Sequence, residues 1–192
     1  PPSPILSGLV GSEMCIRDRV TGVYMIDSAA NEIWRGMLPR WPDISSLFAF
    51  DQIVGIVEFS GGLSIWSRAG GVSVLDRSNG LEIYSRTIHF GDKISRLSYS
   101  EEGGWFVMLH EGSIAVMDKI EADFSHYKTG SPVLDAQFIN GSWKWTGWRH
   151  DGSLTGQVVD IFERASVGVS IINGSVLTND GSLREWGATR RT

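Results

Sequence analysis

Short alternations of apolar and polar residues recur along the chain, and no long amphipathic helical pattern competes with them. Val57-Glu58-Phe59, Leu97-Ser98-Tyr99 and Ala136-Gln137-Phe138 each alternate as the residues of a half-buried strand do. The aromatic residues that end these segments are 40 and 39 residues apart. The pattern therefore predicts short β-strands that return at an interval near forty residues.

A second set of strand candidates ends in aspartate. Three of these segments match closely and the fourth, Gly156 to Val159, matches more loosely. The aspartates are separated by 49, 42 and 42 residues, and they are Asp27, Asp76, Asp118 and Asp160. Because an aspartate that recurs in every repeat argues for a structural role, we expect each carboxylate to cap backbone donors of the following turn.

Tight turns that contain glycine recur at a fixed place relative to these strand candidates, and each such set of equivalent positions is called a column. We expect turns at Arg68 to Gly71, His110 to Ser113, His150 to Ser153 and Asn179 to Ser182. Their glycines can adopt the positive φ that hairpin turns require; they are Gly70, Gly112, Gly152 and Gly181. A strand candidate precedes each turn: Leu63 to Arg68, Trp105 to His110, Lys144 to His150 and Ser175 to Thr178.

A fourth strand candidate follows the aspartate column, at Glu32 to Trp34, Leu81 to Ser85 and Asp123 to Tyr127. Four short strands in each repeat of about forty residues is the arithmetic of a β-propeller blade. The alternative is a β-sandwich whose spacing is accidental. The sequence predicts an all-β chain of four-stranded antiparallel blades over residues 20–192, in about four to five repeats with the first and last partial.

The repeats are not uniform. The 49-residue interval offers two candidates for the first strand of its blade, Ile44 to Phe50 and Ile53 to Phe59. The step from Gly152 to Gly181 is 29 residues, which is short for a full repeat. We therefore expect a strand to be shortened or lost near Phe162 to Ile172.

Two related propeller families share features with these residues. Asp180 to Trp186 resembles the third strand of a WD-repeat blade, and Gly91-Asp92 and Gly130-Ser131 stand where that family usually has Gly-His. The signature dipeptide is never complete, because its tryptophan column holds Ile26, Leu75, Met117, Val159 and Trp186. Gly22 to Asp27, followed by Ile33-Trp34, is more similar to a quinoprotein-type blade. The resemblance covers about residues 20–187 and implies the fold more than a function, since propellers host many unrelated roles.

The first 19 residues include a segment that resembles no protein repeat. Residues 14–18 read Met-Cys-Ile-Arg-Asp, which matches codon for codon the translation of a transposase adapter used in sequencing libraries. We interpret residues 1–19 as a non-native segment ahead of a truncated repeat domain, and we expect residues 12–19 to pack against nothing. A native helix start capped by Ser12 is the alternative. Cys15 is the only cysteine, so the repeat domain has no thiol chemistry.

Composition narrows the classes of function. The net charge is −5, and a mildly acidic chain is a poor match for nucleic acid, which rewards clustered Lys and Arg. No apolar run reaches the roughly 18 residues of a membrane-spanning helix. No phosphate-binding loop, nucleophile–base spacing or catalytic carboxylate pair stands out, so we expect no cofactor. The compartment stays open: cytoplasmic or, with a signal peptide lost from the fragment, periplasmic or extracellular.

Candidate binding residues come from the turns of one face. His110 and His150 occupy equivalent positions in successive repeats, and a carboxylate follows each. Such pairs could ligate a metal, but polar residues beside glycine also make good turns, and we predict no metal site. Trp148 beside Arg149 is either a binding anchor or a core residue. The candidate set is Arg68, His110, Glu111, Trp148, His150 and Asp151.

Two Asn-Gly-Ser segments, at 140–142 and 173–175, match both a glycosylation acceptor and a hairpin turn. The hairpin interpretation is the stronger one. It adds two more turns to the repeat.

The leading hypothesis is a non-catalytic scaffold that binds a protein or peptide through one face of the blades. A fragment of a quinoprotein-like propeller enzyme, with its site near the central channel, is the first alternative. A secreted or envelope-anchored assembly factor is the second. Because the chain holds too few repeats for a seven-blade ring, we also expect an open arc whose unpaired edges invite self-association.

Overall fold

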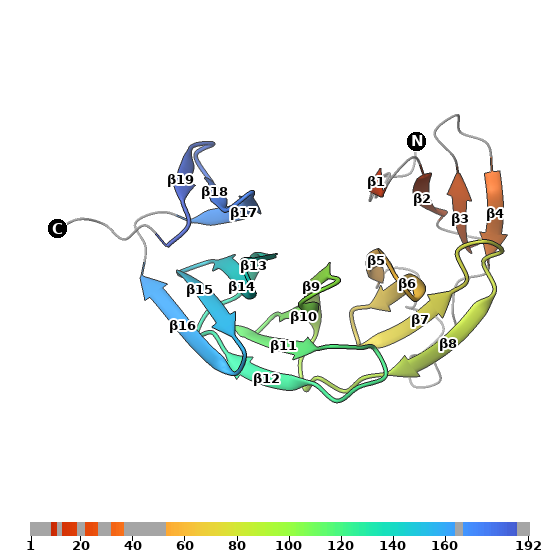
Figure 1. Cartoon of the computed structure of the whole chain (residues 1–192), viewed down its shortest axis with the longest axis horizontal. Coiled ribbons are helices and arrows are strands. Elements are labelled where there is room, and N and C mark those ends of the chain that lie inside the picture. Colours follow the sequence, from red (N-terminus) through yellow and green to blue (C-terminus); the bar gives the residue numbers. More distant parts are fainter. Residues whose placement is uncertain are drawn as a thin grey trace. The chain divides into compact units, whose positions relative to one another are not determined.

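The structure is a computed structural model that describes residues 9–10, 13–18, 22–26, 32–36, 53–163 and 167–187. Within these ranges the regular elements are all β-strands, and they form five antiparallel sheets (Figure 1). Each sheet is a meander in which strands that follow one another in the chain are hydrogen-bonded neighbours. This confirms the predicted all-β architecture of propeller blades. The chain divides into two compact units, residues 1–89 and 90–192.

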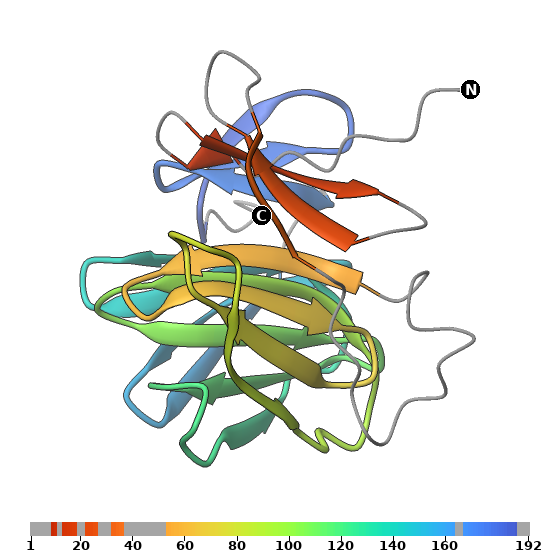
Figure 2. The same cartoon turned by 90° about the vertical axis from the view of Figure 1, so that its right-hand side faces the viewer.

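The first unit contains two four-stranded sheets. The first sheet comprises β1 (Leu9–Val10), β2 (Glu13–Asp18), β3 (Gly22–Ile26) and β4 (Glu32–Gly36). The second comprises β5 (Ile53–Phe59), β6 (Gly62–Ser67), β7 (Gly71–Leu75) and β8 (Glu82–Thr87), whose strands lie side by side, gold to olive, in Figure 2. Of the two candidates for the first strand of this sheet, Ile53–Phe59 is the one that pairs with β6. The other, residues 44–50, lies outside the described residues.

Strand β2 corrects one expectation. Residues 12–19 were expected to pack against nothing, but residues 13–18 pair with β1 on one side and with β3 on the other. Val23 to Ile26 form the third strand of their blade, as expected, and β1 and β2 make that first blade four-stranded. Backbone hydrogen bonds do not depend on side-chain identity, so pairing is open even to a segment that was never selected for this fold. The adapter origin of the segment stays a hypothesis.

The second unit contains two four-stranded sheets and one three-stranded sheet. The first comprises β9 (Ile94–Ser100), β10 (Gly104–Leu109), β11 (Ser113–Met117) and β12 (Ser125–Lys128). The second comprises β13 (Val133–Ile139), β14 (Ser142–Gly147), β15 (His150–Thr155) and β16 (Val158–Glu163). The third comprises β17 (Gly168–Ile172), β18 (Ser175–Thr178) and β19 (Leu183–Glu185).

An apolar cluster joins the first two sheets of the second unit. Its buried members come from β10, β11, β13, β14 and β15, and they are Phe106, Met108, Ile114, Val133, Ala136, Trp143, Trp145 and Leu154. The rings of Phe106 and Phe138 lie 5.0 and 5.5 Å from that of Trp143, centroid to centroid. The indole N–H of Trp143 donates to the Gly103 carbonyl oxygen at 2.9 Å. These side chains pack the two sheets against each other, as the repeat pattern requires.

Both Asn-Gly segments form the hairpin turns that were predicted. Asn140 and Asn173 have φ values of 52° and 48°, and the glycines that follow them have φ values of 76° and 81°. Two successive residues with positive φ define the turn that matches the twist of a two-residue hairpin. These turns join β13 to β14 and β17 to β18.

The predicted turn at His150 to Ser153 was wrong. These residues lie in strand β15, and the turn between β14 and β15 is Trp148-Arg149. Gly152 faces Trp145 across the β14–β15 pair, and a Cβ built there would stand 2.0 Å from the indole ring. This glycine leaves room for a buried aromatic ring and supplies no positive φ.

The aspartate column holds in part. Asp76 follows β7, and one of its carboxylate oxygens accepts from the backbone N–H of Ser78 at 2.7 Å, which is the predicted cap. Asp118 follows β11 in the same way. Asp160 departs from the column, because it lies inside β16 opposite Ser153. Asp27 lies outside the described residues.

Near Phe162 to Ile172, where a strand was expected to be shortened or lost, the strand is shortened: β17 has five residues, whereas the first strands β5, β9 and β13 have seven each. Strand β16 extends to Glu163, and β17 begins at Gly168. The 29-residue step looked short because Gly152 was taken for a turn residue, although it lies inside β15. The glycine that does lie in a turn is Gly181, between β18 and β19.

Candidate binding face on the second unit

At one end of the second unit, the same backbone hydrogen bond recurs in all three sheets. The first residue after the second strand donates its N–H to the carbonyl oxygen of the residue before the first strand. The pairs are His110 with Lys93 at 3.0 Å, Trp148 with Pro132 at 2.8 Å and Asn179 with Val167 at 3.0 Å. We call this end the turn face; its residues are 91–93, 110–112, 129–132, 148–149, 167 and 179–181.

The side chains of the dipeptides Gly91-Asp92 and Gly130-Ser131 accept hydrogen bonds from the second residue of the neighbouring turns. A carboxylate oxygen of Asp92 accepts from the backbone N–H of Glu111 at 2.6 Å. The hydroxyl oxygen of Ser131 accepts from the backbone N–H of Arg149 at 3.3 Å. These two positions are therefore structurally equivalent, as their resemblance to the Gly-His of WD repeats implies.

Trp148 is the large apolar residue of the turn face. Its side chain is 59% exposed, whereas Trp143 and Trp145 on the preceding strand are 3% and 0% exposed. The sequence left Trp148 open between core and anchor; the structure exposes it, while Trp143 and Trp145 belong to the core. With its own N–H bound to Pro132 and that of Arg149 bound to Ser131, the turn that carries Trp148 is held at both residues.

The other candidate residues divide between the two units. His110 and Glu111 are exposed in the β10–β11 turn, and Arg68 is exposed in the β6–β7 turn of the first unit. His150 is half-buried at the start of β15, where its Nδ1 lies 3.5 Å from the hydroxyl of Ser131. His110 and His150 are therefore not equivalent: one follows a second strand and the other begins a third.

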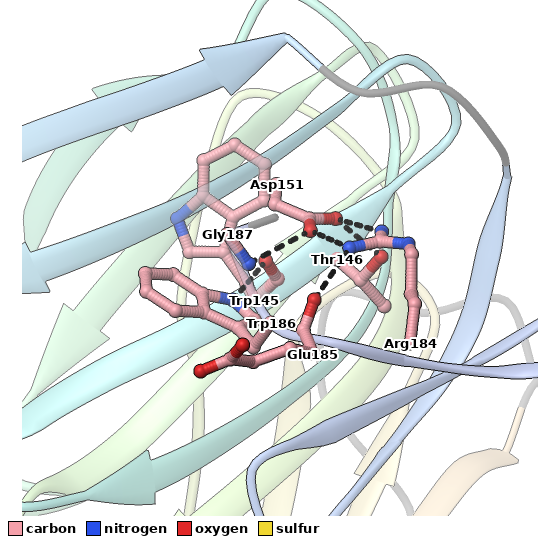
Figure 3. Close-up of polar contacts among 7 residues, drawn as sticks. All are labelled: Trp145, Thr146, Asp151, Arg184, Glu185, Trp186 and Gly187. Atoms are coloured by element: carbon pink, nitrogen blue, oxygen red, sulfur yellow. Dashed lines mark hydrogen bonds and ion pairs between the residues drawn. The ribbon is translucent and has the colours of Figure 1, made fainter. Parts of the chain in front are cut away.

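Asp151 belongs to the interior rather than to the exposed turns. It is 0% exposed, and the two oxygens of its carboxylate accept from the guanidinium of Arg184 at 2.5 and 2.8 Å (Figure 3). The hydroxyl of Thr146 donates to it at 2.8 Å, and the backbone N–H of Gly187 lies 3.5 Å away. This two-pronged ion pair ties β15 to β19 of the neighbouring sheet.

Trp186 packs beside this ion pair. Its indole N–H donates to the carbonyl oxygen of Trp145 at 3.2 Å, and its ring meets that of Phe162 edge-on at 5.4 Å between centroids. The ammonium of Lys144 lies 4.7 Å from the centroid of the Trp186 ring. The tryptophan that completes the WD-like segment therefore fastens the three-stranded sheet to its neighbour.

The sequence did not reveal a row of polar groups on the first strands. Strands β5, β9, β13 and β17 each shift register near their start, next to Gly55, Arg96, Asp135 and Ser170. In the second unit β13 contacts both β9 and β17, and Figure 1 shows it between them. Bulges re-aim side chains in this way. A polar residue at the same place in successive first strands was the signal available.

Asp135 is the centre of that row. One of its oxygens accepts from the hydroxyl of Ser170 at 2.6 Å and from the backbone N–H of Ile171 at 2.8 Å. A guanidinium nitrogen of Arg96 lies 3.8 Å from the other oxygen. Arg96 also donates to the carbonyl oxygen of Leu134 at 3.1 Å. The row links all three sheets of the second unit.

Asp180, in the β18–β19 turn, accepts several hydrogen bonds. Its donors are the hydroxyl of Thr178 and both the N–H and the hydroxyl of Ser182. These bonds, that of Thr178 first, lower the pKa of Asp180 to about 2. In the first unit, hydrogen bonds from Ser78 lower the pKa of Asp76 in the same sense. Both carboxylates act on local turn structure.

A recess of about 150 Å³ lies at the opposite end of the second unit. Its lining comes from β11, β12 and the β15–β16 turn, and comprises Val116, Met117, Asp118, Asp123, Ser125, Tyr127, Gly156 and Gln157. Over the described residues, no three His, Cys, Asp or Glu side chains gather closely enough to hold a metal ion. None of the described segments is a helix with the length and apolar character to cross a membrane.

Comparisons with known proteins show the fold. No family model matches the chain, and no curated protein matches it. Among solved structures it is similar to the computationally designed Ika8 protein, with a TM-score of 0.65 and 11% identity over 95% of this chain and 57% of that one. It is also similar to BamB from Moraxella catarrhalis, with a TM-score of 0.61 and 11% identity over 90% of this chain and 54% of that one.

A third similar structure is BBS1N in complex with ARL6DN, with a TM-score of 0.63 and 10% identity over 92% of this chain and 61% of that one. BamB and BBS1 are β-propeller proteins, which supports the propeller-like repeat fold. The chain spans about 54 to 61% of the length of these three structures.

Proposed function

We propose that this chain is a β-propeller scaffold that binds a protein or peptide segment through the turn face of its second unit. The observation that carries the proposal is the exposed Trp148 on a turn held at both of its residues. Exposed tryptophan beside arginine is the composition of an interface anchor. A turn that is already ordered loses little conformational entropy on binding, which favours affinity.

The neighbouring residues suit the same role. Arg149, His110 and Glu111 are exposed around the anchor and offer donors, an acceptor and charge. Interfaces typically surround a buried aromatic anchor with a polar rim of this kind. The similar BBS1N structure is a complex with ARL6DN, which supports a protein-binding role for a chain of this fold.

A peptide selection tests the proposal. Random peptides of about twelve residues, displayed on phage, are selected on the immobilised full chain, and the dissociation constants of enriched peptides are then measured by fluorescence anisotropy. We expect Trp148→Ala to weaken these peptides at least about tenfold, since an anchor residue contributes on that scale. Gln157→Ala, at an exposed position of the β15–β16 turn, is the matched control and should bind as the wild type does.

Two further measurements test whether weaker binding reflects the loss of a contact on the turn face. Because Trp148 is exposed, its replacement should leave the melting temperature unchanged, so weaker binding would not reflect unfolding. The double variant His110→Ala with His150→Ala examines the rest of the face. If enriched peptides bind wild type, Trp148→Ala and the double variant equally well, the turn face is not the binding surface.

A further inference from the structure

Charge is unevenly divided between the two ends of the second unit. The end away from the turn face carries five exposed carboxylates and one exposed ammonium on the β9–β10 turn and the β11–β12 connection: Glu101, Glu102, Asp118, Glu121, Asp123 and Lys119. The turn face has three exposed cations at or beside it: Lys93, Lys128 and Arg149. The chain as a whole has a net charge of −5, so these cations stand out against an acidic protein.

Backbone hydrogen bonds place the three cations at successive links of the turn face. The carbonyl oxygen of Lys93 accepts from the N–H of His110. Lys128 precedes Thr129, whose N–H donates to the carbonyl oxygen of Gly112 at 2.9 Å. Arg149 follows Trp148 and is itself bonded to Ser131. The ion pairs described in this unit, Arg96 with Asp135 and Arg184 with Asp151, involve none of the three cations.

The carboxylates on the same face are largely occupied. The two oxygens of Asp92 accept the backbone N–H groups of Lys93 and Glu111, and Asp180 accepts from Thr178 and Ser182. Glu111 is the carboxylate that remains exposed beside them. The three exposed cations are accessible to a ligand, whereas two of the three carboxylates accept hydrogen bonds from groups of the turns themselves.

We infer that the segment bound by the turn face is acidic, with an apolar or aromatic side chain on Trp148 and carboxylates toward Arg149, Lys128 and Lys93. This rests on the proposed function and adds the chemistry of the partner. An acidic segment gains from the cations and is repelled from the opposite, acidic end. Charge complementarity of this kind selects partners and speeds their association.

The peptides enriched on the wild-type chain provide the test. We expect them to carry an excess of Asp and Glu over the unselected library. For the tightest peptide, Arg149→Glu should raise the dissociation constant about tenfold, the scale measured for close charge pairs at interfaces. Lys119→Glu, the same charge change at the opposite end, should leave it within about twofold, because charges beyond a Debye length are screened.

Two further measurements distinguish a failure of this inference from a failure of the proposed function. Replacing the acidic residues of that peptide by Lys should abolish binding, and added salt should weaken the acidic peptide. If Trp148→Ala abolishes binding while Arg149→Glu and the Lys-substituted peptide behave like the originals, the face binds peptides but not by charge, and this inference is overturned alone. If neither variant has an effect, or no peptide is enriched, the proposed function falls with it.

Discussion

Replacing Arg184 by Met removes the guanidinium that pairs with the buried carboxylate of Asp151. The side chain of Asp151 is 1% exposed, so the carboxylate cannot recover its hydration in the folded chain. Two other donors described at this carboxylate, the hydroxyl of Thr146 and the N–H of Gly187, carry no net charge and cannot replace the guanidinium. Breaking a buried pair by removing one partner costs about 3 to 5 kcal/mol, because the other charge stays buried.

The structure places the expected loss at the lower end of that range. The side chain of Arg184 is 15% exposed, so water can reach the site that Met would leave partly filled. We therefore expect Arg184→Met to lower the free energy of unfolding by about 3 kcal/mol. Adding Asp151→Asn removes the stranded charge and keeps an acceptor for Thr146. The double variant should thus be more stable than Arg184→Met alone, by about 1 kcal/mol or more.

Urea unfolding followed by tryptophan fluorescence measures the loss, with Trp145 and Trp186 next to the altered site. The stability of a repeat protein depends on the contacts between neighbouring repeats, so hydrogen exchange can show which sheet loses stability. It should appear in the amides of β17–β19 before those of β9–β12. Arg77→Met is the control: its pair with Glu58 is half-exposed at the arginine and should contribute no more than about 1 kcal/mol. A double variant less stable than Arg184→Met, or a loss no larger than that of Arg77→Met, would refute the reasoning.

Two more predictions concern single positions. Gly152→Ala should lower the free energy of unfolding by about 1 to 3 kcal/mol, because the new methyl would stand 2.0 Å from the ring of Trp145. The near-ultraviolet circular dichroism of Trp145 should change as well. An unchanged spectrum and an unchanged stability would contradict the close packing. Asp180→Asn should lower the melting temperature near neutral pH. The folded pKa of Asp180, about 2, lies below the ordinary aspartate value of 3.8, so its stabilisation is present above about pH 4 and is lost as the pH falls through 2. The difference in melting temperature between wild type and Asp180→Asn should therefore shrink toward about pH 2, and a constant difference would show that the carboxylate charge is not responsible.

The fold was predictable because strand alternation and turn chemistry are local. Apolar and polar residues alternate in segments such as Leu97-Ser98-Tyr99 of the first strands, and the Asn-Gly turns leave a dipeptide that few other structures favour. Both the alternation and the turn dipeptides can be recognised although the repeats differ in sequence. Trp143 lies in β14 and is buried, whereas Trp148 is exposed because it lies in the turn that follows this strand.

The errors arose where one residue type serves two physical purposes. Gly152 looked like the turn glycines, but it is a glycine that makes room for Trp145. Taking it for a turn also moved Asp151 from a buried ion pair to an exposed loop, and Asp160 from a strand to a cap. Similarly, the pairs of Asp135 with Arg96 and of Asp151 with Arg184 join residues that are 39 and 33 positions apart. A polar residue at the same place in successive first strands marks the positions of Arg96 and Asp135, but no local pattern says which residues pair.

The attachment of the three-stranded sheet differs in kind from the attachment of the other two sheets of the second unit. Sheets β9–β12 and β13–β16 share eight buried apolar residues. In β17–β19 the buried apolar residues are Ile171 and Val176, and two carboxylates of the β13–β16 sheet bind it. Asp135 holds Ile171 and Ser170 at one end, and Asp151 holds Arg184. Directional polar bonds therefore set the position of this sheet where apolar area is small. The β18–β19 turn is part of the turn face, so the geometry of the proposed binding face depends on these two buried carboxylates as well as on the Trp148 turn.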